Sequence, residues 1–355
     1  MLCLPQLAFL AALPQAFCYT PEFRYDKHET SYANLPKKAE LPKVPGHLDG
    51  SAWLWGPEDG LGRLNFLTPA RVKASMEEVR TGEMVPLNLA LKLIDPPMYN
   101  RAAFEHSYGV FGDGSLAILD EHYYLNTQSS TQWDGFHHFA HLPSRLFYNN
   151  CTESTSDPNN HKCGIHEWAA HGIAGRGILL DFASYAEEKG IKADAFDATG
   201  ITHEQLHAVA AHQGINLKNI DEGGDIRIGD MLMVRMGWVS QYQKMTKEER
   251  IALAEKKDQK FIGLEPSEEN AQWIHDSYFS AVAGDAPAFE TWPPVGLSLH
   301  EQVLTFWGIA LGEFFDLEKL AEKCKEKKKW TFFVTSAPFN VEDGIATWAN
   351  ALAIL

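Results

Sequence analysis

Segments with helix signals and segments with strand signals alternate along this chain, and this order restricts the fold more than any other feature. The apolar runs 178–180 and 231–234 predict strands. Between them, Thr202 and Gln205 form a capping-box pattern ahead of an apolar stripe that ends at Gly214. Strands and helices that mix in this way predict a domain of the α/β or α+β class.

Other elements are predicted by the same signals. Thr68 is expected to cap a helix whose buried stripe is formed by Val72, Met76 and Val79. Alternating apolar residues over 85–93 predict a strand with one buried face. The remaining predicted helices cover 165–171, the segment after Thr246, 267–273 and 300–311, and a strand at 332–334 precedes the apolar tail 351–355.

Composition restricts the class of protein and its partners. The chain has 355 residues, of which 45% are apolar, and this is enough for a substantial core. Its formal net charge is −16, which repels phosphate backbones and anionic lipids. We therefore expect no nucleic-acid partner and no membrane partner, and a small molecule is the preferred ligand class.

The N-terminal segment has the character of a targeting sequence. Residues 4–17 form an apolar run that is too short to span a bilayer and is followed by small residues. We interpret residues 1–18 as a secretory signal peptide, with an N-terminal extension that carries no targeting function as the alternative. Residues 19–50 are predicted to form an extended arm over one domain at 51–355.

Two further features agree with export and predict a secreted protein. Asn150-Cys151-Thr152 is a glycosylation sequon, so Asn150 is a candidate glycan site. Cys151 and Cys163 bracket a short polar segment that an oxidising compartment could close as a disulfide. The spacing of the cysteines does not match a zinc finger.

The densest group of chemically active side chains lies between residues 129 and 141. Asp134 can bind a cation through oxygen, and His137, His138 and His141 can bind a cation or move a proton near neutral pH. The spacing of four between Asp134 and His138 keeps both groups local. The alternative is a polar loop with solvated histidines.

The chain resembles the cyclase family of metal-dependent hydrolases, which includes bacterial kynurenine formamidase and isatin hydrolase, and most closely its fungal-type branch. The resemblance rests on four blocks in order, at 55–69, 131–139, 229–238 and 299–313. It implies the swivelling β/β/α fold of that family, with a mixed sheet core, surrounding helices and assembly as a homo-oligomer.

The family motif H-x-x-x-H-x-D-x-x-x-H-F aligns with this chain at its second half. The metal-binding aspartate matches Asp134, and the closing H-F matches His138 and Phe139. The two leading histidines fall on Gln128 and Gln132, whose neutral amides bind metals more weakly than imidazole. His138 is therefore the expected general acid/base.

The family's distant ligands match His300 and Glu313, which we expect a helix and its C-terminal end to present toward a central loop. The resemblance thus implies a metal site of Asp134, His300 and Glu313, with Gln132 as an oxygen ligand. Such a ligand set suits manganese or zinc, with magnesium as an alternative.

The expected function is metal-dependent hydrolysis of a cyclic or aryl amide, imide or lactone, with His138 moving the proton. Trp55, Trp133 and Phe136 are candidates for lining the substrate cavity, with core packing as the alternative for each. Two other functions remain open. One is a ring-closing cyclase of secondary metabolism, and the other is a secreted small-molecule-binding protein on a decayed hydrolase fold.

Overall fold

The computed structural model describes residues 24–112, 117–154 and 156–355, so the predicted signal peptide at 1–18 lies outside the described residues. Within the described part of the arm, Tyr32 and Leu35 are buried against the domain. The Tyr32 hydroxyl donates a hydrogen bond to the carbonyl of Ser277 at 3.1 Å. Each helix in the described ranges is too short or too polar to traverse a bilayer.

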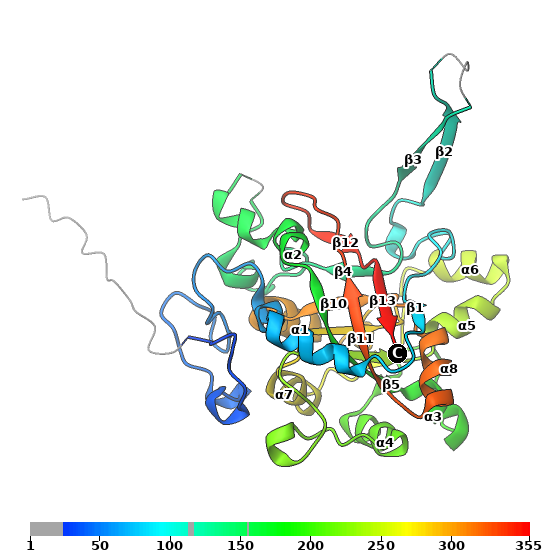
Figure 1. Cartoon of the computed structure of the whole chain (residues 1–355). Helices are drawn as coiled ribbons and strands as arrows, with labels where there is room; N and C mark the ends of the chain where they lie inside the picture. Colours follow the sequence, from blue (N-terminus) through cyan, green and yellow to red (C-terminus); the bar gives the residue numbers. More distant parts are fainter. Residues whose placement is uncertain (1–23, 113–116, 155) are drawn as a thin grey trace, which may run out of the picture.

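The core is a nine-stranded sheet in which strands from both ends of the chain meet (Figure 1). Its central strands β5, β7, β9 and β10 are parallel, whereas the flanking strands are antiparallel. In spatial order the strands are β1 (Met84–Pro86), β13 (Ala351–Ile354), β11 (Thr331–Ser336), β5 (Ile173–Asp181), β7 (Met231–Arg235), β9 (Ala281–Gly284), β10 (Ala310–Glu313), β4 (Gln132–Asp134) and β12 (Ala346–Trp348).

Helices surround this sheet, which confirms the predicted α/β class with a mixed sheet core (Figure 1). Two small sheets, β2–β3 (Glu105–Val110 and Leu119–Tyr124) and β6–β8 (Gly200–Ile201 and Gly263–Leu264), lie outside it. The helices are α1 (Pro69–Ser75), α2 (Ile165–His171), α3 (Phe182–Lys189), α4 (His203–Gln213), α5 (Trp238–Lys244), α6 (Lys247–Ala254), α7 (Glu268–Asp276) and α8 (Glu318–Lys327).

The predicted helix starts are confirmed by their side-chain caps. The Thr202 hydroxyl accepts from the backbone N–H of Gln205, and the Gln205 side chain accepts from the backbone N–H of Thr202, so the capping box forms. Helix α4 then ends at Gly214, whose φ of 77° is a conformation that glycine adopts without steric cost. The Thr68 hydroxyl caps α1 in the same way by accepting from the backbone N–H of Arg71.

Two predicted elements are wrong in extent. Helix α1 ends at Ser75 and a 3₁₀ turn follows, so Met76 is 57% exposed and does not belong to a buried stripe. The strand expected over 85–93 is shorter and consists of β1 alone. Leu87 and Leu89 beyond it are still buried, as every second residue of the predicted strand should be. Over 85–89 the local pattern therefore predicted burial better than the end of the element, whereas for α1 it predicted neither.

The helix expected over 300–311 is also wrong, because the helical turn ends at Phe306 and strand β10 begins at Ala310. The first half is a single π-helical turn, η9 (Glu301–Phe306). Gly308 ends it with φ 61°, and a Cβ at this position would lie 2.4 Å from the ring of Tyr148. Only glycine fits both the backbone and the space, and the chain then extends into the sheet.

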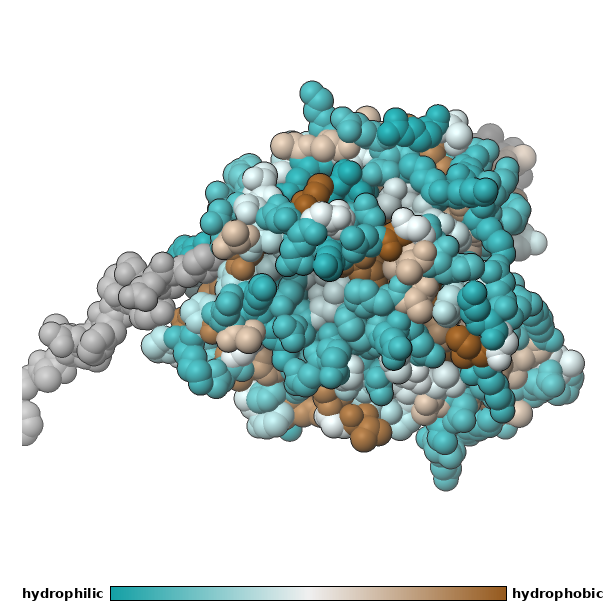
Figure 2. All heavy atoms as spheres, turned by 90° about the horizontal axis from the view of Figure 1, so that it is seen from below, coloured by the Kyte–Doolittle hydropathy of each residue, from teal (hydrophilic) through white to brown (hydrophobic). Residues whose placement is uncertain are grey.

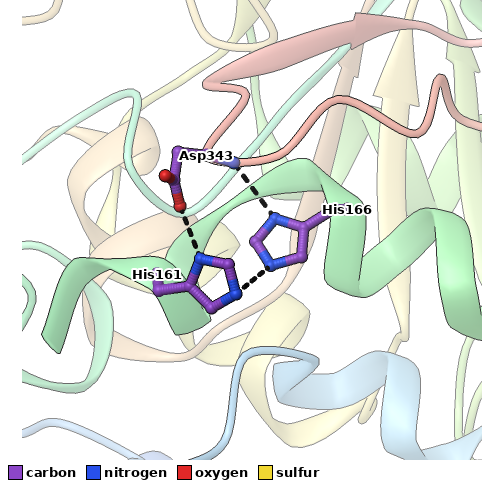
Figure 3. A group of neighbouring side chains, drawn as sticks. All are labelled: His161, His166 and Asp343. Atoms are coloured by element: carbon purple, nitrogen blue, oxygen red, sulfur yellow. Dashed lines mark hydrogen bonds and ion pairs between the residues drawn. The ribbon is translucent and has the colours of Figure 1, made fainter. Parts of the chain in front are cut away.

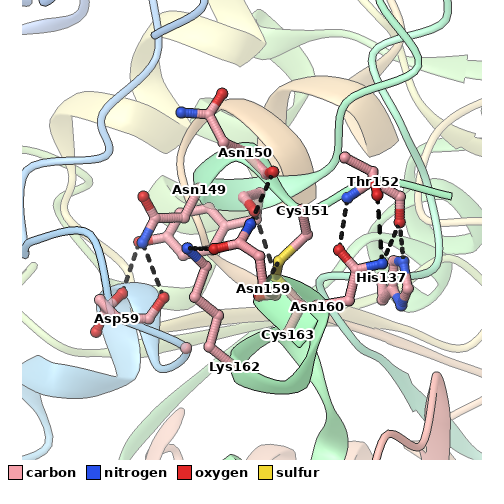
Figure 4. Close-up of a disulfide and its surroundings, with 12 residues drawn as sticks. Asp59, His137, Asn149, Asn150, Cys151, Thr152, Asn159, Asn160, Lys162 and Cys163 are labelled. Carbon is pink, nitrogen blue, oxygen red and sulfur yellow. Dashed lines mark hydrogen bonds between the residues drawn. A yellow bond between two sulfur atoms is a disulfide. The ribbon is translucent and has the colours of Figure 1, made fainter. Parts of the chain in front are cut away.

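The predicted disulfide between Cys151 and Cys163 is present, with Cα atoms 6.7 Å apart (Figure 4). It joins the turn that carries Asn150 to the 3₁₀ helix η7 (Pro158–Cys163). The Asn150 side chain donates to the carbonyl of Gly46 at 3.1 Å. Its glycosylation stays a prediction.

Candidate active site

The register between β4 and β10 brings the candidate acidic ligands together. Gln132 lies opposite Glu313 in this antiparallel pair, and Asp134 lies opposite Leu311. Residues two apart on a strand project from the same face, so Gln132 and Asp134 share the face that Glu313 occupies. Strands therefore present these side chains, and the expected loop and helix end were wrong.

Asp134, His300 and Glu313 form a buried cluster with exposed fractions of 0%, 4% and 2%. One ligand atom from each lies within 4.8 Å of the other two. His300 Nε2 lies 2.9 Å from Glu313 Oε1. The three predicted ligands lie far apart along the chain, and the fold brings them together at one point.

The hydrogen bonds of Asp134 indicate that this cluster fits a divalent cation. Its Oδ1 accepts from the amides of Gln128 at 2.8 Å and Gln132 at 3.2 Å. Its Oδ2 is buried and finds no hydrogen-bond donor among the described residues. A buried carboxylate oxygen without a partner is costly, and a cation held by two carboxylates and one imidazole would satisfy it.

Glu290, which no sequence pattern indicated, contacts His300 on the side away from Glu313. Glu290 Oε2 accepts from the backbone N–H of His300 at 2.7 Å, and its Oε1 lies 3.3 Å from Nδ1. Such a carboxylate fixes the orientation of a metal-binding imidazole. Glu290 is fully buried and comes from the segment after β9.

Charge coupling shifts the pKa values of this cluster. Burial by itself lowers the pKa of His300, but the carboxylates of Glu290 and Glu313 outweigh burial and raise that pKa well above its ordinary value. Burial and the neighbouring Asp134 carboxylate raise the pKa of Glu313 to about 7, although His300 acts in the opposite direction. A bound cation would relieve the repulsion between the two carboxylates.

Gln132 is oriented with its amide nitrogen toward the carboxylates. Its Nε2 donates to Glu313 Oε2 at 2.8 Å and to Asp134 Oδ1 at 3.2 Å, whereas its Oε1 is buried with no partner among the described residues. In this orientation Gln132 presents its nitrogen to the acidic ligands, and its role as an oxygen ligand stays a prediction. The amide joins the two acidic ligands by hydrogen bonds.

His138 lies beside the cluster with its side chain 23% exposed. Its Nε2 is 3.9 Å from the unpartnered Asp134 Oδ2, and its Nδ1 is 3.1 Å from Gln128 Nε2. Burial lowers the pKa of His138, although the Asp134 carboxylate opposes the shift. The ring is thus a neutral base near pH 7, within reach of the site and of solvent.

The neighbouring histidines point elsewhere. His137 Nε2 contacts the carbonyl of Thr152 at 2.6 Å, as Figure 4 shows beside the disulfide. His141 Nδ1 contacts the hydroxyl of Ser144 at 2.7 Å. Neither belongs to the Asp134 cluster. His141 therefore does not take the place of either family-motif histidine, the positions that Gln128 and Gln132 occupy in this chain.

The aromatic candidates for substrate binding pack inside the core. Trp133 is 1% exposed and donates from its indole N–H to Ser336 Oγ at 2.9 Å. Phe136 is fully buried against Trp168. Trp55 packs on Phe66 with ring centroids 4.9 Å apart. These contacts account for the packing of the three side chains, of which Trp55 is half-buried, and their part in substrate binding stays a prediction.

A cavity of about 950 Å³ lies near the cluster, although none of Asp134, His138, His300 and Glu313 lines it. Its wall includes Trp292, whose ring lies 6.4 Å from that of His300, and Tyr99, whose ring lies 6.1 Å from that of Trp292. Arg101 also lines it and donates to the carbonyl of Gln128 at 2.5 Å. No spacing or motif along the chain predicted this grouping.

Comparison with known proteins agrees with this fold. A family model described as putative cyclase matches residues 61–291. The crystal structure of a novel cyclase superposes with a TM-score of 0.73 at 24% identity, covering 86% of this chain and 99% of that one. No curated protein matches the chain by sequence.

Isatin hydrolases share the fold at lower identity. Isatin hydrolase A from Labrenzia aggregata, bound to benzyl benzoate, gives a TM-score of 0.52 at 15% identity, covering 76% of this chain and 93% of that one. An isatin hydrolase bound to the product analogue thioisatinate gives 0.52 at 14% identity, covering 81% and 95%.

Proposed function

The chain belongs to the putative cyclase family, and from this membership we propose that it is a metal-dependent hydrolase of a cyclic or aryl amide, imide or lactone. The observation that carries the proposal is the convergence of Asp134, His300 and Glu313 on one point, with Asp134 Oδ2 left without a donor among the described residues. Similar folds in isatin hydrolases support the reaction class.

Each side chain of the site has a distinct role in this proposal. Asp134, His300 and Glu313 hold a divalent cation, manganese or zinc, which when bound supplies polarisation of the substrate carbonyl and a lowered pKa of water. Glu290 keeps the proton of His300 on Nδ1, so that Nε2 faces the cluster. His138 accepts the proton of the attacking water and returns it to the leaving nitrogen or oxygen.

The cavity beside the cluster supports a small aromatic substrate. Tyr99 and Trp292 form an aromatic wall, and Arg101 adds a cation beside it, with its guanidinium 5.1 Å from the centre of the Tyr99 ring. Sites for small molecules are commonly apolar with a few placed polar groups. The rest of the lining is largely polar and includes Lys256, Lys257 and Asp258, so the aromatic wall and Arg101 are the part that favours an aryl amide or a fused cyclic imide.

A ring-closing reaction would use the same groups in reverse, with His138 giving and taking protons in the opposite order. The third candidate, a binding protein without activity, is favoured by one observation: Gln132 spans both acidic ligands with its amide nitrogen. Such a bridge holds the carboxylates together without a cation.

We also propose export and self-association. The Cys151–Cys163 disulfide supports an oxidising compartment, since such bonds are rare in the cytosol. Self-association is supported by the β2–β3 hairpin, which projects from the body in Figure 1 and exposes Tyr108, Leu119 and Tyr124 by 71%, 63% and 63%. By contrast, the face in Figure 2 is mainly hydrophilic, with apolar side chains in small groups.

Metal content and metal-dependent turnover test the main proposal. The purified protein should carry about one divalent transition metal per chain at this site, and a chelator should abolish hydrolysis of a panel of aryl formamides, cyclic imides and lactones. Added manganese or zinc should restore it. Protein that binds no metal at Asp134 and is not stabilised by added metal would contradict the proposal and favour the binding protein.

A further inference from the structure

We propose that a second cation site lies on the surface at His161 and His166, separate from the buried cluster. His161 belongs to η7, His166 to α2, and Asp343 to the segment between β11 and β12. Figure 3 shows the three side chains facing one another. One ligand atom from each lies within 4.8 Å of the others.

The spacing of the two imidazoles matches that of metal-bound histidines. His161 Nε2 and His166 Nε2 are 3.2 Å apart, and the ring centroids are 4.2 Å apart. Two nitrogens that bind one tetrahedral zinc ion at about 2.0–2.1 Å are about 3.3 Å from each other. The distance between the two Nε2 atoms therefore needs almost no change for the rings to share a cation.

Carboxylates lie on both sides of the imidazole pair. Asp343 Oδ1 is 2.9 Å from His161 Nδ1, so it fixes the proton there and leaves the lone pair of Nε2 for a ligand. Glu167 Oε1 is 3.6 Å from His166 Nε2 and supplies an oxygen next to the nitrogen pair. Two imidazoles with a carboxylate oxygen select zinc, nickel or copper over magnesium and calcium.

Two contacts must change when the cation binds: the hydrogen bond between the two Nε2 atoms and a backbone hydrogen bond to His166. The backbone N–H of Asp343 donates to His166 Nδ1 at 3.2 Å, which places the proton of a neutral His166 on Nε2. Binding through Nε2 moves this proton to Nδ1 and opens that hydrogen bond. Asp343 lies in an exposed turn closed by the Gly344 N–H to the Val341 carbonyl, so the adjustment involves surface backbone.

The elements that carry the imidazoles are held in place. The disulfide of Cys163 anchors the end of η7, two residues after His161. Gly164 joins η7 to α2, and a Cβ there would lie 2.5 Å from His166 Nδ1. A preorganised pair of ligands loses little conformational freedom on binding, which favours occupancy at low metal concentration.

A cation here would join parts of the fold that are distant in sequence. The Ile165 N–H already donates to the Gly344 carbonyl at 2.8 Å, and the Gly135 N–H donates to the Ile345 carbonyl at 2.9 Å. The same segment thus contacts α2 and the residue after Asp134. Occupancy would fasten this segment to the disulfide-bonded region and stabilise the end of β4.

Zinc titration calorimetry of the mature, disulfide-bonded protein tests the site. In wild type and in Asp134→Ala, one equivalent of zinc should bind at this surface and raise the melting temperature. His161→Ala and His166→Ala should each weaken that equivalent more than 100-fold. Asp343→Asn, which keeps the shape of the side chain, should weaken it by about 10–100-fold, the usual effect of removing an orienting partner.

The His203–His207 pair on α4 provides the matched control. Its Nε2 atoms are 3.1 Å apart, but no metal-binding group of three or more residues in the described ranges includes it. His203→Ala should leave zinc binding unchanged. Retention of the surface equivalent in folded His161→Ala and Asp343→Asn, or its loss in His203→Ala, would overturn the proposal. The Asp134→Ala background keeps this outcome independent of the proposed active site.

Discussion

Glu290 contacts His300 twice, through the backbone N–H at 2.7 Å and through ring Nδ1 at 3.3 Å. Glu290→Gln should keep the fold but lower metal affinity at the buried cluster by about 10–100-fold, because the imidazole loses the carboxylate that orients it. Metal titration with circular dichroism checks both statements. Glu301→Gln is the control, since Glu301 accepts instead from the Leu142 N–H; equal losses in both variants would refute the role.

Asp134→Ala removes a charged ligand, so metal occupancy and hydrolysis should fall together. The carboxylate is fully buried and one of its oxygens has no donor among the described residues, which makes it the strongest candidate ligand of the cluster. Elemental analysis after dialysis, with His161→Ala in both proteins to remove the proposed surface site, measures the occupancy. Metal retained in full by the Asp134→Ala protein would show that Asp134 is not a ligand.

His138→Ala should lower turnover by roughly 10²–10⁴-fold while metal stays bound, which is the usual contribution of a positioned proton-transfer group. Steady-state kinetics on the metal-loaded enzyme measure the change. His137→Ala serves as the adjacent control with a mild effect, because its ring contacts the Thr152 carbonyl outside the cluster. The opposite ranking of the two variants would refute the assignment of His138.

His275 makes the stability of the fold dependent on pH. Burial lowers the pKa of this fully buried imidazole to about 3, with the Arg63 charge acting in the same direction. The unfolded chain binds the proton more readily below about pH 6.5, so stability that is present above this pH is lost as the pH falls toward 3. The full shift corresponds to a change in the free energy of unfolding on the order of 5 kcal/mol.

Urea unfolding at pH 7 and pH 4 measures this dependence. His275→Gln should be less stable than wild type at pH 7 but should lose less stability between the two pH values. His171→Ala should keep the wild-type pH dependence, because His171 is exposed at the end of α2. If the free energy of unfolding of His275→Gln depends on pH as it does in wild type, other groups control acid unfolding.

The disulfide should stabilise the fold chiefly by restricting the unfolded chain. Cys151 and Cys163 are separated by 12 positions, and closing a loop of that size corresponds to about 3 kcal/mol. Cys151→Ser/Cys163→Ser should lower the free energy of unfolding by that order. Reductant should destabilise wild type but not the double variant; sensitivity of both would point to another redox group.

The sequence alone determined those parts of the protein that depend on neighbouring residues. The caps at Thr68 and Thr202 were predictable because a side chain bonds a backbone N–H three residues away. The strand around 231–234 was predictable from its apolar run. The resemblance of the motif blocks also indicated the family, and the match over 61–291 confirms it.

The tertiary structure alone decided which side chains meet. Asp134 and Glu313 are neighbours because β4 and β10 pair in one register, and a shift by one residue would turn them to opposite faces. Glu290 and the short segment of Tyr99 and Arg101 come from distant parts of the chain, and no sequence signal places them near the site.

The tertiary structure also decided which aromatic side chains are buried. Trp133 and Phe136 are aromatic side chains of the kind that commonly line pockets, yet the surrounding sheet and helices enclose them. Local patterns specify hydrogen bonds between residues close in the chain, whereas a site depends on strand register and on how distant faces pack, and these are fixed only when the whole sheet assembles.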